Sequence, residues 1–138
     1  MSERTITVEH NGTTYYGHLA KIDSTSLGYE SHGILSAHLH TSWQGGGVSV
    51  GGYCLDHPKD REGRDYSRVG TAYGLDHIIR IIETVGVEKW EELKGSSVIV
   101  LFESKHSLGS MSKGIAGVHN DKVLILKEHA DEWIGDER

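Results

Sequence analysis

The chain of 138 residues has one cysteine, one proline and one phenylalanine, and it has no long apolar run. The single cysteine, Cys54, excludes an internal disulfide and is typical of a protein from a reducing cytoplasm. No apolar run reaches membrane-spanning length, and the first ten residues lack the apolar core of a signal peptide. We therefore expect a single domain over residues 1–138, located in the cytoplasm, with no membrane partner.

Basic residues are fewer than acidic ones, 14 against 20, so the formal net charge is −6 at pH 7. A protein that binds long nucleic acids without sequence preference needs a net basic face, so the charge argues against that class. It does not argue against a small anionic ligand that a few placed cations hold.

The patterns of common catalytic and metal sites are missing too. The sequence has no HExxH or CxxC pattern, no serine sits in a GxSxG elbow between a strand and a helix, and no lysine follows its glycine-rich run as it would in a phosphate loop. His38 and His40 share one face of a predicted strand, which suits two zinc ligands, but a polar sheet face explains the pair more simply. Cys54 is expected to be a packed thiol. We predict a protein that is not an enzyme and has no cofactor, catalytic residue or bound metal.

Alternating residues and turn signals predict a sheet in most of the chain. The expected strands cover residues 5–8, 13–23, 34–43, 48–55 and 98–103, and a C-terminal β-hairpin covers 111–127 around Asn120-Asp121. Residues 26–33 and 57–66 are expected to be loops, and the tail around Trp133 a short turn or helix. The predicted fold is α+β, with an antiparallel sheet wrapped around one central amphipathic helix.

That helix follows Thr71 and ends near Gly86. Its apolar residues recur at helical spacing and form one stripe, made of Leu75, Ile78, Ile79, Ile82 and Val85. Ile81 lies off the stripe, so a second surface must cover the other side of the helix. Either the sheet or a second copy of the protein supplies it, and we expect a homo-oligomer.

The segment before the helix suits an anion. Arg68, Gly70 and Thr71 put a cation and unpaired backbone N–H groups near the helix start, although simple capping explains Thr71 more readily. Tyr73 is a candidate for stacking on a base. Polar residues elsewhere complete the predicted ligand-binding set: Tyr29 and His32 in the run 26–33, and Asn120 and Lys122 in the hairpin turn. The alternative is that both segments are ordinary loops with no ligand.

Four segments in order resemble a family of small phage and prophage proteins. They are KIxSTxLGYExHGI at 21–34, GGYxLD at 51–56, RVGTAYG at 68–74 and GVEKWEELKG at 86–95. Within this group the chain is similar to the anti-Thoeris sponges, the first-described Thoeris anti-defence type. The resemblance covers roughly residues 15–100. The chain departs from the family pattern in its longer C-terminal half, where Asn120 and Lys122 lie.

The resemblance implies a non-enzymatic homo-oligomer in the host cell cytoplasm that sequesters a cyclic nucleotide signal of bacterial immunity. The ligands of such sponges are cyclic ADP-ribose isomers, and some members also hold cyclic oligonucleotides, an anti-CBASS activity. Their pockets lie between protomers and use arginine, asparagine and an aromatic ring, for which Arg68, Asn120 and Tyr73 are the best matches.

Two other classes remain open from the sequence. One is a small metal-dependent phosphodiesterase or lyase that degrades such a signal with His38, His40 and one further ligand. The other is a protein inhibitor that binds a host factor through residues 57–66 and uses no small molecule.

Overall fold

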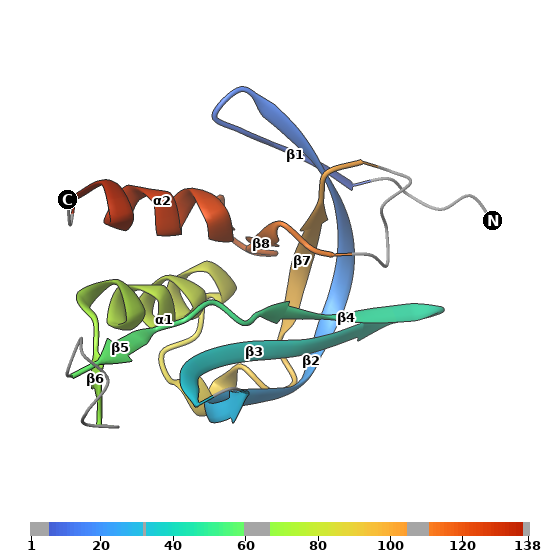
Figure 1. Ribbon diagram of the computed structural model, residues 1–138. Coiled ribbons are helices and arrows are strands. Elements are labelled where there is room, and N and C mark those ends of the chain that lie inside the picture. Colours follow the sequence, from blue (N-terminus) through green and yellow to red (C-terminus); the bar gives the residue numbers. More distant parts are fainter. Residues whose placement is uncertain (1–5, 32, 60–66, 105–110, 137–138) are drawn as a thin grey trace.

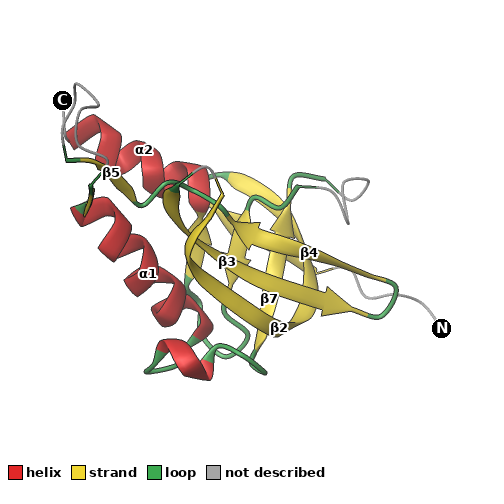
Figure 2. Ribbon diagram, turned by 60° about the horizontal axis from the view of Figure 1, so that its bottom comes forward, coloured by secondary structure: helices red, strands yellow, loops and turns green. Residues whose placement is uncertain are grey.

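The computed structural model describes residues 6–31, 33–59, 67–104 and 111–136. Within these ranges the fold is mixed α+β, with a mostly antiparallel sheet and two helices that lie side by side next to it (Figures 1 and 2). The helices are α1 (Ala72–Val85) and α2 (Leu126–Asp136), with a short 3-10 helix η1 (Trp90–Glu92). The strands are β1 (Ile6–His10), β2 (Thr13–Ser31), β3 (Ile34–Trp43), β4 (Gly46–Gly51), β5 (Asp56–Pro58), β6 (Arg68–Gly70), β7 (Ser97–Phe102), β8 (Gly114–Ala116) and β9 (Val123–Ile125).

The long strand β2 organises the sheet. The strand order is β4-β3-β2-β7-β8-β9, and β1 pairs with the first part of β2. A register shift between Ile22 and Ser24 marks a bulge, which bends the strand as Figure 1 shows. Residues 26–31, predicted to be a loop, belong to β2 because they pair with β3; this pairing outweighs the weak strand preference of Gly28.

The hydrophobic core lies between one face of this sheet and α1. The predicted alternation in β3 is confirmed, since Ala37, Leu39 and Thr41 are buried on the core face while His38 and His40 are only partly buried on the other. The core also contains Val98, Val100 and Phe102 of β7, and Ile81 of α1. Trp43 packs edge-on against Phe102, with 6.2 Å between ring centroids.

Helix α1 begins and ends where the sequence predicts, but only part of the predicted stripe packs against the core. Thr71 is its N-cap and Gly86, with φ of 92°, its C-cap. The residues that the structure buries are Gly74, His77, Ile81 and Thr84. Of the predicted stripe, Val85 packs against the core, whereas Leu75 and Ile79 are 63% and 41% exposed, so one protomer does not cover that part of the stripe.

The reason for this rotation is a close approach of the helix to Leu55. A Cβ atom added at Gly74 would lie only 2.1 Å from the Leu55 carbonyl oxygen. Only a glycine permits this contact, so the face with Gly74 must point inward and the stripe through Leu75 and Ile79 turns outward.

The C-terminal region contains more helix than the predicted fold. Strands β8 and β9 pair over three residues each, and the chain continues directly into α2. Two helices, instead of one central helix, therefore lie beside the sheet (Figure 2). Trp133 lies in α2, in the segment where a short turn or helix was expected.

Two further segments differ from the predicted elements. Strand β4 ends at Gly51, so residues 52–55 of the expected strand are not in the sheet. The expected loop 57–66 starts inside β5, and its residues 60–66 lie outside the described part of the chain. Within the described ranges, neither helix has the length and apolar character needed to cross a membrane.

The contact at Gly74 gives a first testable prediction. Alanine normally stabilises a helix interior by about 0.5–1 kcal/mol relative to glycine. Gly74→Ala should instead lower the free energy of unfolding by about 1–3 kcal/mol, because the new methyl group collides with backbone. Urea denaturation measures the change, with Gly28→Ala as the control, since nothing lies within 4 Å of a Cβ placed there. A Gly74→Ala protein as stable as the wild type would show that the approach to Leu55 is not needed.

Candidate functional site

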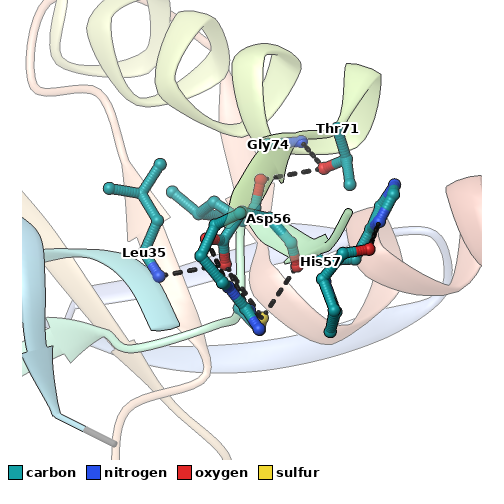
Figure 3. Close-up of polar contacts among 9 residues, drawn as sticks. Leu35, Asp56, His57, Thr71 and Gly74 are labelled. Atoms are coloured by element: carbon teal, nitrogen blue, oxygen red, sulfur yellow. Dashed lines mark hydrogen bonds and ion pairs between the residues drawn. The ribbon is translucent and has the colours of Figure 1, made fainter. Parts of the chain in front are cut away.

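Arg68 lies on β6 and forms a two-point ion pair with Asp56 on β5. The distances are 2.9 Å from Nε to Oδ2 and 2.8 Å from Nη2 to Oδ1. Figure 3 shows the contacts of the Asp56 carboxylate, which also accepts a hydrogen bond from the Leu35 amide at 3.0 Å. The Asp56 side chain is 1% exposed and that of Arg68 21%, so the cation predicted near the helix start is already paired within the protein.

The pairing sets the charge state of Asp56. The hydrogen bond from Arg68, aided by the Leu35 amide, lowers the pKa of Asp56 to about 2, although burial acts in the opposite direction. The carboxylate is therefore ionised at neutral pH and fixes the plane of the guanidinium group.

Thr71 links the start of α1 to the end of Leu55. Its hydroxyl accepts a hydrogen bond from the Gly74 amide at 2.8 Å and donates one to the Leu55 carbonyl at 2.9 Å (Figure 3). Capping is thus the observed role of Thr71. The amides of Ala72 and Tyr73 belong to the first turn of the helix, whose N–H groups have no acceptor within the helix itself.

Two more side chains complete this corner. Cys54 is exposed, contrary to the expected packed thiol, and its Sγ donates a hydrogen bond to the Asp56 carbonyl at 3.1 Å. Tyr29, near the end of β2, is 59% exposed. Its neighbour Gly28 pairs with Ser36 of β3, and the adjacent Leu35 donates its amide to Asp56, so β3 links Tyr29 to this corner. We call these five residues the Arg68 corner: Tyr29, Cys54, Asp56, Arg68 and Thr71.

Tyr73 packs against side chains of both helices. Its ring packs against His77 and His129, with centroid distances of 5.8 and 5.3 Å. Its hydroxyl is buried without a hydrogen-bond partner among the described residues, and burial raises the pKa of Tyr73 to about 12. In this arrangement Tyr73 cannot stack on a ligand at the Arg68 corner.

Asn120 and Lys122 lie at the opposite end of α1. The Asn120 amide donates to the carbonyl of Thr84 at 3.2 Å and accepts from the Lys122 amide at 2.8 Å. A helix of 14 residues is about 20 Å long. One protomer therefore brings Tyr29, Arg68 and Thr71 together but keeps Asn120 and Lys122 apart from them, and His32 lies outside the described residues.

A cavity of about 810 Å³ opens elsewhere, between β4, the start of β2 and α2. Its charged residues are two lysines and four acids: Lys113, Lys127, Glu103, Glu128, Asp131 and Glu132. Lys127 is paired with Asp131 at 2.7 Å, so this lining does not favour a polyanion. The sequence reasoning missed the cavity because its walls come from distant segments; the acidic stretch 128–132 was the one local signal.

The histidine pair on β3 forms a polar sheet face. The rings of His38 and His40 are nearly parallel, with centroids 6.0 Å apart, and each contacts a serine: Ser36 at 3.4 Å and Ser49 at 2.8 Å. In the described part of the chain, no group of three or more histidine, cysteine, aspartate or glutamate residues could hold a metal ion.

No protein-family model, curated protein or solved structure matches this chain. The resemblance to the anti-Thoeris sponges therefore remains a prediction from the sequence motifs. The function has to be argued from the site itself.

The Asp56–Arg68 pair gives a second prediction. Asp56→Asn keeps the shape of the side chain but leaves the partly buried guanidinium without its counter-charge. We expect the melting temperature at pH 7 to fall by about 5 °C or more. Because the pKa of Asp56 is lower in the folded protein, its stabilisation is present above about pH 4 and is lost as the pH falls toward 2.

Calorimetric melts at pH 7 and pH 2.5 measure the difference in melting temperature between the wild type and Asp56→Asn, which should be smaller at pH 2.5. Asp23→Asn is the control, because Asp23 is an exposed carboxylate on β2. Equal melting temperatures of Asp56→Asn and the wild type at pH 7 would contradict a structural role for the pair.

Proposed function

We propose that this protein is a non-enzymatic homo-oligomer that binds a cyclic nucleotide at the Arg68 corner and thereby sequesters it. The observation that carries the proposal is the meeting of three features at one corner: an exposed tyrosine ring, an oriented guanidinium group and the start of α1. The narrower role, a phage anti-defence sponge for a cyclic ADP-ribose isomer or a cyclic oligonucleotide, rests on the sequence resemblance.

The corner offers each part of a nucleotide a contact. Asp56 engages Nε and Nη2 of Arg68, and Nη1 is the guanidinium nitrogen outside that pair. Together with the amides at the helix start, Nη1 provides donors for phosphate oxygens. Tyr29 supplies an exposed ring for stacking on a base. Because Asp56 cancels the charge of Arg68, the contact with phosphate depends more on the positions of these N–H donors than on the net charge of the corner.

The chemistry of the corner favours capture over cleavage. Asp56 is the carboxylate nearest to a nucleophile there, with 3.5 Å between its Oδ1 and Cys54 Sγ. A carboxylate with a pKa of about 2 is a weak base and does not take a proton from a thiol or water at neutral pH. The described residues of the corner can thus contact a ligand, but they include no activated nucleophile that would cleave it.

An exposed apolar stripe runs along α1 from the corner and suits a second copy of the chain. Leu75 and Ile79 form it on α1, and Val69 on the preceding strand β6 is a further exposed apolar residue. In a two-fold dimer each protomer presents the same patch. If the two α1 helices cross antiparallel, the end with Asn120 and Lys122 of one protomer lies beside the Arg68 corner of the other. This arrangement reunites the predicted ligand-binding residues that one protomer holds about 20 Å apart.

The stripe leads to a prediction about assembly. Light scattering at micromolar concentration should give a mass of at least twice the 15.2 kDa of one chain. The double change Leu75→Glu and Ile79→Glu should give a monomer, because it places four charges in the symmetric dimer contact. Leu19→Glu, at an exposed residue of β2, is the control and should leave the mass unchanged. A wild-type mass of one chain would contradict the oligomer.

Ligand capture is predicted to depend on Tyr29. Stacking of a base on an aromatic ring is worth about 1–3 kcal/mol, so Tyr29→Ala should weaken binding at least about fivefold. Since the ring is 59% exposed, folding should be little affected. Calorimetric titration with cyclic ADP-ribose isomers and a cyclic oligonucleotide measures the loss, with Leu19→Ala as the control on the same strand. Wild-type affinity in Tyr29→Ala would place the site elsewhere.

A further inference from the structure

Four aromatic side chains, two buried and two partly buried, form a cluster between α1, α2 and the segment after β4. His77 of α1 is at its centre, with ring centroids 5.8 Å from Tyr73, 6.1 Å from His129 and 6.3 Å from Tyr53. These are packing distances, so the cluster is filled by its own side chains.

The polar atoms of this cluster are poorly satisfied. His77 is 0% exposed, and neither of its ring nitrogens has a hydrogen-bond partner among the described residues. The same holds for Nδ1 of His129 and the hydroxyl of Tyr73. Buried polar groups without partners are uncommon in folded proteins and reduce stability.

The carboxylate nearest to this cluster already accepts two hydrogen bonds and makes none with His77. Asp76 of α1 accepts hydrogen bonds from His129 at 2.7 Å and from Trp133 at 3.2 Å, both on α2. These two bonds join the helices. Arg80 is the other charged group of α1 that acts on Asp76, and Tyr53 and Cys54 are the titratable groups that act on Tyr73 from the segment after β4.

We propose that this cluster is an acid-sensitive latch, which holds α2 on α1 while His77 is neutral and releases it when His77 takes up a proton.

The physical basis is the cost of burying a charge. A neutral imidazole can be packed without water, whereas an imidazolium ion without an acceptor cannot. Burial, and then the proximity of His129, lower the pKa of His77 to about 4, although Asp76 acts in the opposite direction. Once the helices separate and water reaches the ring, its pKa returns toward the ordinary value of about 6.5.

The direction of the pH dependence follows from the difference between the pKa of His77 in the closed and the open state. Because the pKa of His77 is lowered in the closed state, the closed state is fully favoured above about pH 6.5 and loses stability as the pH falls toward 4. The open-to-closed ratio should increase by up to about tenfold per pH unit over that interval. The pKa of Asp76 is itself lowered, first by the hydrogen bond from His129, so Asp76 stays ionised over this interval.

Release of α2 would also change the cavity described above, since α2 supplies part of its wall through Leu126, Lys127 and Asp131. The latch does not depend on the proposed nucleotide function, because none of the four aromatic residues of the cluster belongs to the Arg68 corner and its test uses no ligand.

Hydrogen exchange followed by mass spectrometry tests the latch in the full-length protein without ligand. Protection factors, corrected for the intrinsic pH dependence of exchange, are compared between α2 and the core strand β7 at several values from pH 7.5 to 4.5. In the wild type, protection of α2 should fall about tenfold per unit below pH 6.5 while β7 stays protected. His77→Phe should abolish this fall, and His38→Phe, on the opposite sheet face, should retain it.

Should His77→Phe fold poorly, His77→Gln serves the same purpose, because its amide carries no charge at any of these pH values. An equal fall in α2 protection in the His77 variants and the wild type would overturn the proposal. Loss of protection in α2 and β7 together in the wild type would overturn it too, since that indicates unfolding of the whole domain.

Discussion

The contact between the start of α1 and the backbone of Leu55 is the constraint on which the rest of the structure depends. Gly74 allows the approach, and the hydroxyl of Thr71 donates to the Leu55 carbonyl while it caps the helix. The adjoining residue Asp56 fixes Arg68. The helix is therefore held in both position and rotation by a glycine, a cap and an ion pair in one short stretch of chain.

This rotation determines which surfaces are free for function. It directs His77 and Ile81 inward, where His77 meets α2 and Ile81 enters the core. It directs Leu75 and Ile79 outward, beside the corner where Arg68 and Tyr29 are found. The proposed oligomer contact, ligand site and acid-sensitive latch are thus consequences of the same helix orientation.

Local signals in the sequence predicted local structure well. Strand β3 has the predicted bounds, and α1 ends where Gly86 indicates. The capping role of Thr71 was one of the two readings the sequence offered. Each of these features depends on residues within a few positions of one another, where alternation, helical spacing and capping preferences are decisive.

Features that depend on distant residues could not be predicted in the same way. The apolar stripe did not show which face of the helix meets the core, because the deciding contact joins Gly74 to a backbone carbonyl 19 positions earlier. The pairing of Arg68 was not predicted, because its partner, Asp56, lies 12 positions away across β5 and β6. Tyr73 and His129 meet only because α2 packs on α1. The predicted ligand-binding residues were consequently divided between the two ends of one helix.

The central claim, capture of a cyclic nucleotide without turnover, is tested most directly by the fate of the ligand. The protein would be incubated with cyclic ADP-ribose isomers or a cyclic oligonucleotide, separated from free ligand by gel filtration and denatured by heat, and the released small molecules identified by mass spectrometry. The account predicts that one of these ligands elutes with the protein and is recovered with its mass unchanged. Recovery of cleaved products, or of no ligand at all, would contradict it.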